Sequence, residues 1–547
     1  MTWAQRYDPL GSAFWSTLVA ALPIVALLGS LAWLRLKAPI AALAGLVVAL
    51  AVAILAIDMP VSMAFATAAF GAAYGLLPIG WIVLNVVFLY QLVERRGLLD
   101  ALRRGVAGLT DDPRLQLLLV AFSFGAFMEG AAGFGTPVAV TGGILIALGF
   151  KPLQASGLSL IANTAPVAFG ALGTPIIALQ GVTGLDLHQL SAMVGHQLPV
   201  FSVIVPFWLV WAYAGWRGML QVWPAVLVAG VTFALPQFLM ATLHGPWLVD
   251  IVAAACSMAC LVTFLRFWKP VGAVSRRDDA LASTGPREAV MPNPSHREAA
   301  TTPKRSLAWL PWIVLTILVF AWGTPTLKAA LNGLSAPRFP VPGLHNLVER
   351  APPVVATLTP EPAVFTLNWL SATGTAILLT ALVTALFLRY GLRELATTWF
   401  SALRRARASL ITIALMLSLG YVTRYSGEDA VLGLAFAQTG ILYPFFGTML
   451  GWLGVALTGS DTSSNVLFGS LQTITAKQLG LDPVLMAAAN SSGGVMGKMI
   501  DAQSIVVAGT VTHAEGQEGT ILRYVFFHSV ALASLVGLLV MLQAYVL

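Results

Sequence analysis

The sequence has few charged residues and almost no cysteine. Only 10% of its 547 residues are charged, whereas soluble globular proteins have about 25%. A soluble enzyme or soluble binding domain is therefore excluded. The two cysteines, Cys256 and Cys260, lie four residues apart in an apolar run that has no histidine or acid to complete a ligand set. A buried structural pair is therefore favoured over a disulfide or a metal site.

The sequence also lacks the motifs of nucleotide-driven and redox proteins. GGVMGKM (493–499) resembles a phosphate-binding loop, but its glycine spacing is wrong and no Ser or Thr follows the lysine. In GAAGFG (130–135) the glycines have the wrong order for a dinucleotide site. The seven histidines are scattered singly, and no nucleophile lies with a base or a metal set in the spans. We therefore expect no enzyme activity, no cofactor and no metal.

Apolar residues, by contrast, are abundant. They make up 58% of the chain, and the mean hydropathy is +0.83. Runs of the roughly 20 residues needed to cross about 30 Å of hydrocarbon recur along nearly the whole chain and predict about 12 to 14 spans. Residues 13 to 34 are predicted as the first span rather than a signal peptide, because the run is long and basic residues follow it. The sequence therefore predicts an all-α, polytopic membrane protein.

The basic residues indicate topology rather than a polyanionic partner. The net charge of +7 comes mainly from short clusters between spans, so no nucleic acid is expected. The most basic segments, 269–306 and 389–407, are placed in the cytoplasm, and 326–365 is placed outside. The stretch 269–306 holds seven basic and four acidic residues with several prolines. It is predicted as a flexible linker between two membrane repeats, 1–268 and 307–547.

The two repeats contain similar interruptions. Residues 125–140 read GAFMEGAAGFGTPVAV, in which three glycines and a proline between Gly130 and Pro137 would break a helix. The basic clusters place this motif on a path from the cytoplasm, and place a similar segment near 460 on a path from outside. Both segments are followed by an Asn-Thr or Asn-Ser pair. Inverted repeats with broken helices are therefore predicted, with a binding site where the interruptions meet.

Two acids lie in these interruptions, Glu129 and Asp461. An unpaired charge at membrane depth costs several kcal/mol, so an intramembrane carboxylate indicates a functional group. We interpret both as proton-coupling residues, because a buried carboxyl group can take up and release a proton. For Asp461 the alternative is a helix cap, since Ser460-Asp461-Thr462 is typical of a helix start.

Polar groups near the same interruptions are suited to a small, oxygen-rich solute, and half-helix N-termini offer N–H groups to an anion. Their alternative role is hydrogen bonding between helices. Lys498 could neutralise a substrate carboxylate or pair with a nearby acid, and the sequence favours neither. The predicted substrate-binding residues are Gly133, Gly135, Thr136, Asn163, Thr164, Ser460, Thr462, Ser463, Ser464, Asn465, Asn490, Ser491 and Lys498.

Five long motifs occur in order along the chain: GAFMEGAAGFGTPVAV (125–140), GFKPL (149–153), NTAPVAFGALGTP (163–175), GWLGVALTGSDTSSNVLFG (451–469) and GGVMGKMI (493–500). Together they resemble the bacterial L-lactate permease family. The resemblance runs through both repeats and implies a proton-coupled secondary transporter of lactate and related 2-hydroxy monocarboxylates such as glycolate. It also implies re-entrant hairpins and an elevator-like movement. Where the family commonly has Ser-Pro-Gln-Ser, this chain has Asp501-Ala502-Gln503-Ser504, which places an extra acid near Lys498.

The predicted function is import of L-lactate with protons across the bacterial inner membrane, with D-lactate and glycolate as further substrates. Within transporters, the alternative is a permease mainly for glycolate or another short 2-hydroxy monocarboxylate, including a sodium-coupled variant. Outside transporters, a channel is the main alternative, because paired breaks also occur in pore filters. The expected partners are the substrate, protons and the lipid bilayer, and a homo-oligomer is left open.

Overall fold

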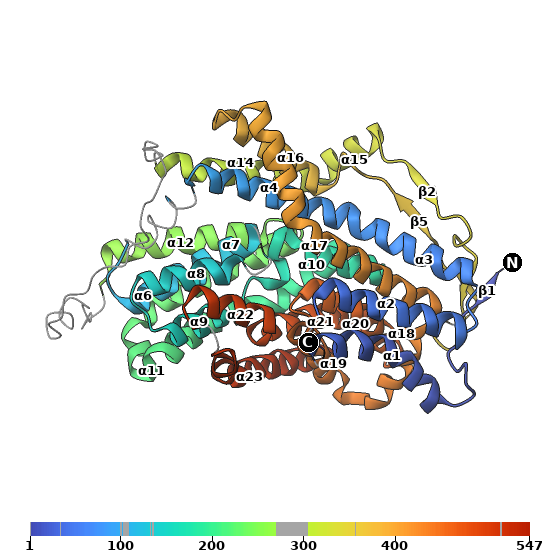
Figure 1. Cartoon of the computed structure of the whole chain (residues 1–547). Helices are drawn as coiled ribbons and strands as arrows, with labels where there is room; N and C mark the ends of the chain where they lie inside the picture. Colours follow the sequence, from blue (N-terminus) through green and yellow to red (C-terminus); the bar gives the residue numbers. More distant parts are fainter. Residues whose placement is uncertain are drawn as a thin grey trace.

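The structure is a computed structural model, and it describes residues 2–32, 34, 36–98, 101, 109–131, 133, 136–269, 305–355, 357–514 and 517–546. Helices dominate it, and the few strands are short (Figure 1). Nine of the described helices are long and apolar enough to cross a membrane, or up to eleven if two bent helix pairs each count as one span. The predicted all-α, polytopic membrane fold is confirmed.

Helices in the first part of the chain begin where the sequence supplies a proline or a capping side chain. Pro113 and Pro152 each lie in the first turn of a helix, and Asp186 accepts a hydrogen bond from the backbone of Gln189 at 2.9 Å. The elements are β1 (Trp3–Ala4), α1 (Ala13–Ala32), α2 (Ala38–Leu55), α3 (Val61–Tyr74), η1 (Gly75–Gly80), α4 (Trp81–Arg95), α6 (Pro113–Leu117), η2 (Leu118–Phe124), α7 (Gly125–Ala131), α8 (Thr136–Ala147), α9 (Pro152–Ala162), η3 (Val167–Phe169), α10 (Gly170–Thr183), α11 (Leu187–Leu243) and α12 (Val249–Phe267).

The second part follows the same local rules. Asp482 caps one helix through the backbone of Val484 at 2.8 Å, and Gly427 ends another with a positive φ of 89°, which glycine adopts without steric cost. The elements are α14 (Arg305–Gly323), α15 (Pro325–Leu334), β2 (Arg338–Pro340), β3 (Val348–Arg350), β4 (Thr359–Pro360), β5 (Val364–Thr366), α16 (Thr373–Phe387), α17 (Leu392–Ser426), α18 (Glu428–Phe436), η4 (Ala437–Leu442), α19 (Tyr443–Thr458), α20 (Asp461–Gln478), α21 (Pro483–Gly497), η5 (Lys498–Ile500), α22 (Ala502–Val511) and α23 (Glu518–Tyr545).

Helix lengths explain why the span count differs from the 12 to 14 expected. Some apolar helices, Pro137–Ala147 and Thr373–Phe387, are too short to cross a bilayer alone. In contrast, α11 has 57 residues, and a straight helix of that length would extend about 85 Å. It turns at Gly215, where φ is 69° and ψ is −179°. The count of nine takes α11 as a single helix.

Short strands and the N-terminal segment form a layer at one end of the molecule, opposite to α6 (Figure 1). Strand β1 pairs with β3 in parallel, β3 pairs with β4, and β2 pairs with β5. This layer contacts the end of α17, because Glu361 accepts hydrogen bonds from Arg424 at 2.6 Å and pairs with Arg350 at 2.7 Å. Burial raises the pKa of the Glu361 carboxyl, but the two guanidinium groups outweigh it and hold that pKa below its ordinary value.

Two contacts connect helices α20 and α9 to distant parts of the chain. Gln478, at the end of α20, donates a hydrogen bond to the carbonyl of Pro353 in the strand layer at 2.9 Å. At the start of α9, Ser156 lies 2.6 Å from Thr512, which follows α22. The inverted repeat and the boundaries 1–268, 269–306 and 307–547 stay predictions, and most of the linker lies outside the described residues.

Candidate functional site

The first interruption separates α7, which ends at Ala131, from α8, which begins at Thr136. Gly133 lies between them with a φ of 56°. Glu129 lies in the last turn of α7 and is 5% exposed. A Cβ atom added to Gly170 would lie 2.6 Å from Oε1 of Glu129, so only glycine lets the two segments approach this closely. The carboxylate is therefore held between the first interruption and the start of α10.

The second interruption lies between α19 and α20. Gly459 ends α19 with a φ of 72°, and the Ser460 hydroxyl caps α20 by accepting a hydrogen bond from the backbone of Ser463 at 3.2 Å. Asp461 is the first residue of α20 and is 3% exposed. Its Oδ2 accepts a hydrogen bond from the Ser491 hydroxyl at 2.5 Å. The cap is therefore Ser460, and the Asp461 carboxylate points to α21 instead.

A network of amides connects this second interruption to the first half of the chain. The Asn465 amide donates to Oδ2 of Asp461 at 3.3 Å and to the carbonyl of Pro175 in α10 at 3.2 Å. Asn490 donates to Oδ1 of Asn465 at 3.0 Å and accepts from Gln472 at 3.2 Å. All these side chains are buried. Asn465 thus joins α20 to α10, 290 residues earlier in the chain.

The chain between α9 and α10 is a further break in the backbone. The helices on either side are bent by 64°. Ala171 and Leu172 have φ values of 44° and 57°, a left-handed conformation that costs roughly 1–2 kcal/mol per non-glycine residue. Asn163 follows α9, and its amide faces the carboxylate of Glu129. Thr164 donates only to the nearby carbonyl of Ile161 at 2.8 Å.

Lys498 lies beside the end of α21 and is 7% exposed. Its ammonium group donates to the carbonyl of Gly459 at 2.6 Å and lies 3.2 Å from Oδ2 of Asp501. The charge of Lys498 also acts on the carboxylates of Glu129 and Asp461. One buried cation therefore serves three carboxylates that come from three different breaks in the helices.

The structure brings together most of the predicted site residues, but some of them make only local contacts. Glu129 and Gly133 lie at the first interruption, and Asn163 lies at the break after α9, where it faces Glu129. The second interruption, α20, α21 and η5 supply Asp461, Asn465, Asn490, Ser491 and Lys498. Local contacts occupy Ser460, Ser463 and Ser464, the last donating to the carbonyl of Gly451. Thr462 is only partly buried. Gly135 lies outside the described residues, as does the side chain of Thr136.

Asp250 was missed by the sequence analysis, although it is 1% exposed and lies against Gly130. Its position at the start of an apolar run, WLVDIVAAA, is typical of an acid at a helix end near the membrane surface. The contact with Gly130 depends on tertiary packing, which no local pattern reports. Within the described ranges, no group of three or more His, Cys, Asp or Glu side chains could hold a metal ion.

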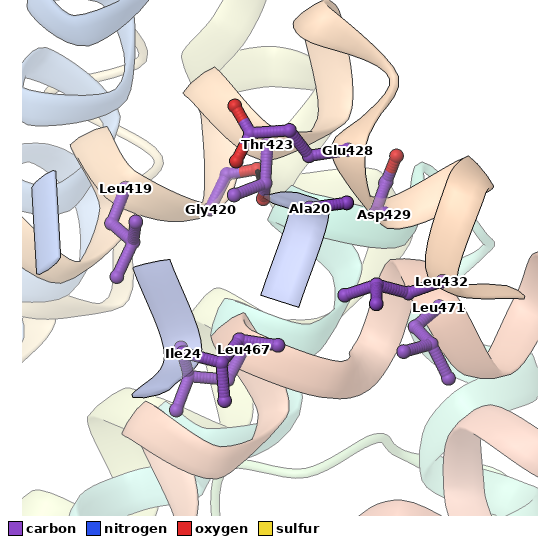
Figure 2. Close-up of a pocket in the computed structure, with 10 residues that line it drawn as sticks. All are labelled: Ala20, Ile24, Leu419, Gly420, Thr423, Glu428, Asp429, Leu432, Leu467 and Leu471. Atoms are coloured by element: carbon purple, nitrogen blue, oxygen red, sulfur yellow. Dashed lines mark hydrogen bonds between the residues drawn. The ribbon is translucent and has the colours of Figure 1, made fainter. Parts of the chain in front are cut away.

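A small cavity lies elsewhere, among α1, α17, α18 and α20 (Figure 2). Its volume of about 10 Å³ is at the lower limit for one water molecule and is too small for a 2-hydroxy acid. Figure 2 shows Glu428 and Asp429 on its rim, beside Thr423 and Ala20. Ser426 and Ser470 are hydrogen-bonded to these two carboxylates. This acid pair is separate from the interruptions described above.

Comparisons with known proteins agree over the whole length of the chain. The family model described as L-lactate permease matches residues 16–547. A glycolate permease, GlcA, of Escherichia coli K12 is 46% identical over 100% of this chain and 99% of its own length. The L-lactate permeases of Salmonella typhimurium and Bacillus subtilis are 45% and 43% identical, again over 100% of this chain and 98% and 99% of theirs.

Proposed function

Because the chain belongs to the L-lactate permease family, we propose that it imports L-lactate together with protons, with D-lactate and glycolate as further substrates. The chain is a multi-pass membrane transporter and not an enzyme. The bacterial inner membrane is the proposed location. Glycolate enters the proposal because a glycolate permease is as similar to this chain as the lactate permeases are.

The observation that carries the proposal is the sharing of Lys498 among three buried carboxylates. Glu129, Asp461 and Asp501 all lie within the electrostatic range of its ammonium group, and all are at most 5% exposed. Three ionised carboxylates with one cation would leave two uncompensated charges in a region of low dielectric, which is costly. Binding of protons to this cluster removes those charges, so a proton-carrying site is favoured.

The same charge balance supplies a reason for coupling. A substrate carboxylate that enters this cluster competes with the acids for the Lys498 ammonium. A carboxylate that the Lys498 ammonium no longer stabilises binds a proton more readily. Binding of the substrate anion and binding of the proton therefore favour each other. Buried hydroxyl and amide groups, among them Ser491 and Asn465, are suited to hydrogen-bond the hydroxyl and carboxylate of a 2-hydroxy acid.

The broken helices support movement of the site as a unit. Asn465 of α20 donates to the carbonyl of Pro175 in α10, and α10 also packs against α7, so α10 contacts a helix of each interruption. We propose that they shift together relative to α1, α2 and α17 in an elevator-like movement. Opposite entry of the two hairpins would then expose the interruptions alternately to each side.

The decisive experiment is uptake of labelled L-lactate by proteoliposomes, with D-lactate, glycolate and pyruvate as competitors. Gradients of pH, voltage and Na⁺ are imposed separately. With one proton per lactate, each pH unit supplies about 1.4 kcal/mol, or about tenfold accumulation, and voltage has no direct effect. With two protons, voltage adds about 2.3 kcal/mol per 100 mV. Uptake driven only by a Na⁺ gradient would establish a sodium-coupled permease. Uptake that glycolate inhibits best would establish a permease mainly for glycolate. A lack of trans-stimulated counterflow would indicate a channel.

Replacing Glu129 with Gln is expected to abolish accumulation driven by a pH gradient while lactate counterflow continues. The amide has nearly the shape of the carboxyl group but cannot take up a proton, whereas exchange of lactate needs no net proton movement. The matched control is Glu94→Gln at the cytoplasmic end of α4, because Glu94 is exposed and lies in a 3.6 Å ion pair with Arg405. Full accumulation by Glu129→Gln at normal expression would remove Glu129 from the proton path.

A further inference from the structure

The strongest unassigned feature is a second carboxyl group beside Glu129. Asp250 lies in the first turn of α12 and is 1% exposed. Gly130, the residue after Glu129, makes the approach possible, since a Cβ atom there would lie 2.6 Å from Cβ of Asp250 and 3.1 Å from the backbone nitrogen of Ile251. The start of α12 therefore lies directly against the turn of α7 that carries Glu129.

Asp250 has no compensating partner in the described part of the chain. Neither of its carboxylate oxygens has a hydrogen-bond partner there, and Oε2 of Glu129 has none either. The amide of Asn163 faces the Glu129 carboxylate and not Asp250. The charge that acts on Asp250 is that of Glu129. Lys498 and Asp501 act on Glu129, so the nearby cation serves Glu129 and not Asp250.

We propose that Asp250 and Glu129 form a carboxyl pair that holds one proton between them, and that this pair is the unit that binds the transported proton. The inference rests on the proposed proton-coupled transport. Two ionised carboxylates near each other in a low-dielectric region repel each other, and Asp250 would be left without a donor. One proton converts an acceptor into an O–H donor, so the pair gains a charge-assisted hydrogen bond.

The pair also gives Asn163 a role. Its amide can donate to the carboxylate member of the pair or accept from the protonated member, so it can stabilise either position of the proton. Release of the proton leaves two carboxylates of which only Glu129 has access to the Lys498 ammonium. Asp250 is therefore a proton-coupling residue that acts through its contact with Glu129, and not a group expected to contact the substrate.

The test is Asp250→Asn in proteoliposomes, because Asn keeps the volume of Asp but cannot share a proton in this way. We expect lactate accumulation to fall from about tenfold per pH unit to no accumulation, while the counterflow rate stays within about twofold, a change worth less than 0.5 kcal/mol. Asp58→Asn is the control, since Asp58 is exposed in a surface ion pair with Arg6. In the double variant Glu129→Gln/Asp250→Asn, accumulation should be no lower than in either single variant.

Full accumulation with an unchanged pH profile in Asp250→Asn would overturn the pair. Equal loss of counterflow and accumulation would also overturn it, since that pattern indicates a structural role. If Asp250→Asn does not fold, infrared spectroscopy of the wild-type protein serves as the test. The carboxyl pair predicts a protonated-carboxyl band that changes when lactate is added and that is missing from the spectrum of Glu129→Gln. A wild-type protein that fails to accumulate lactate on a pH gradient would refute the proposed function itself, and not only this inference.

Discussion

Replacing Lys498 with Met tests how the buried charges are balanced. Met keeps the length and most of the apolar volume of the side chain but removes the ammonium group. Two contacts are lost, the 3.2 Å ion pair with Asp501 and the 2.6 Å hydrogen bond to the carbonyl of Gly459. The side chains of Lys498 and Asp501 are 8% and 1% exposed, so water cannot replace the missing charge.

The magnitude follows from that burial. Removing one partner of a buried ion pair costs about 3–5 kcal/mol, because the other charge is left uncompensated. Lys498→Met should therefore lower the free energy of unfolding by about this amount. Removing the second charge as well, in Lys498→Met/Asp501→Asn, should restore a large part of the loss. The coupling energy between Lys498 and Asp501 from this double-mutant cycle is then about 2–3 kcal/mol, near the upper end of the values found for residues in contact.

The assay is denaturant unfolding of the purified protein in detergent, followed by helical circular dichroism, for the two single variants and the double variant. Lys151→Met is the control, since Lys151 is exposed before α9 and should change stability by no more than about 0.5 kcal/mol. Additive losses in the double variant would refute the pairing. The apparent KM for lactate separates the two roles of Lys498: if the ammonium contacts the substrate, KM rises in the double variant even though stability recovers.

Two further predictions concern close packing at the site and the outer layer. Gly170→Ala should reduce transport at least tenfold, because the added Cβ would lie 2.6 Å from Oε1 of Glu129, whereas Gly333→Ala, with open space around its Cβ position, should transport normally. Ion pairing with Arg424 and Arg350 holds the pKa of Glu361 below its ordinary value, so its contribution to stability is fully present above the unfolded pKa of about 4.3 and is lost as the pH falls through the folded pKa. The difference in melting temperature between wild type and Glu361→Gln should therefore shrink in acid, and a difference that does not change between pH 7 and pH 3 would contradict the ion pairing.

Site residues could be predicted from the sequence where a charged or helix-breaking residue lies within an apolar run. Glu129 stands out because an acid in an apolar run is costly, and Gly459 and Ser460 because they interrupt another apolar run. The replacement that introduces Asp501 also pointed to a partner for Lys498, and the structure places the two 3.2 Å apart. These signals are local, so they can be found without knowing how the chain packs.

Features that depend on packing between distant segments could not be found in this way. Asp250 lies against the turn of α7 that carries Glu129 only because Gly130 lets α12 approach, and Asn465 reaches the carbonyl of Pro175 across 290 residues. The sequence also suggested that Asn163 and Asn490 correspond. In the structure Asn163 follows the last turn of α9, whereas Asn490 lies within α21. The two motifs are alike in composition, but they occupy different positions relative to the breaks.

The central claim is that the two interruptions together hold a small organic acid beside titrating carboxyl groups. A cryo-electron microscopy map of the protein with bound L-lactate, compared with a lactate-free map, tests it most directly. Added density is expected between the α7–α8 interruption and the α19–α20 interruption, within hydrogen-bond reach of Ser491 or Lys498. Added density that touches neither interruption, such as density beside Glu428, would contradict it.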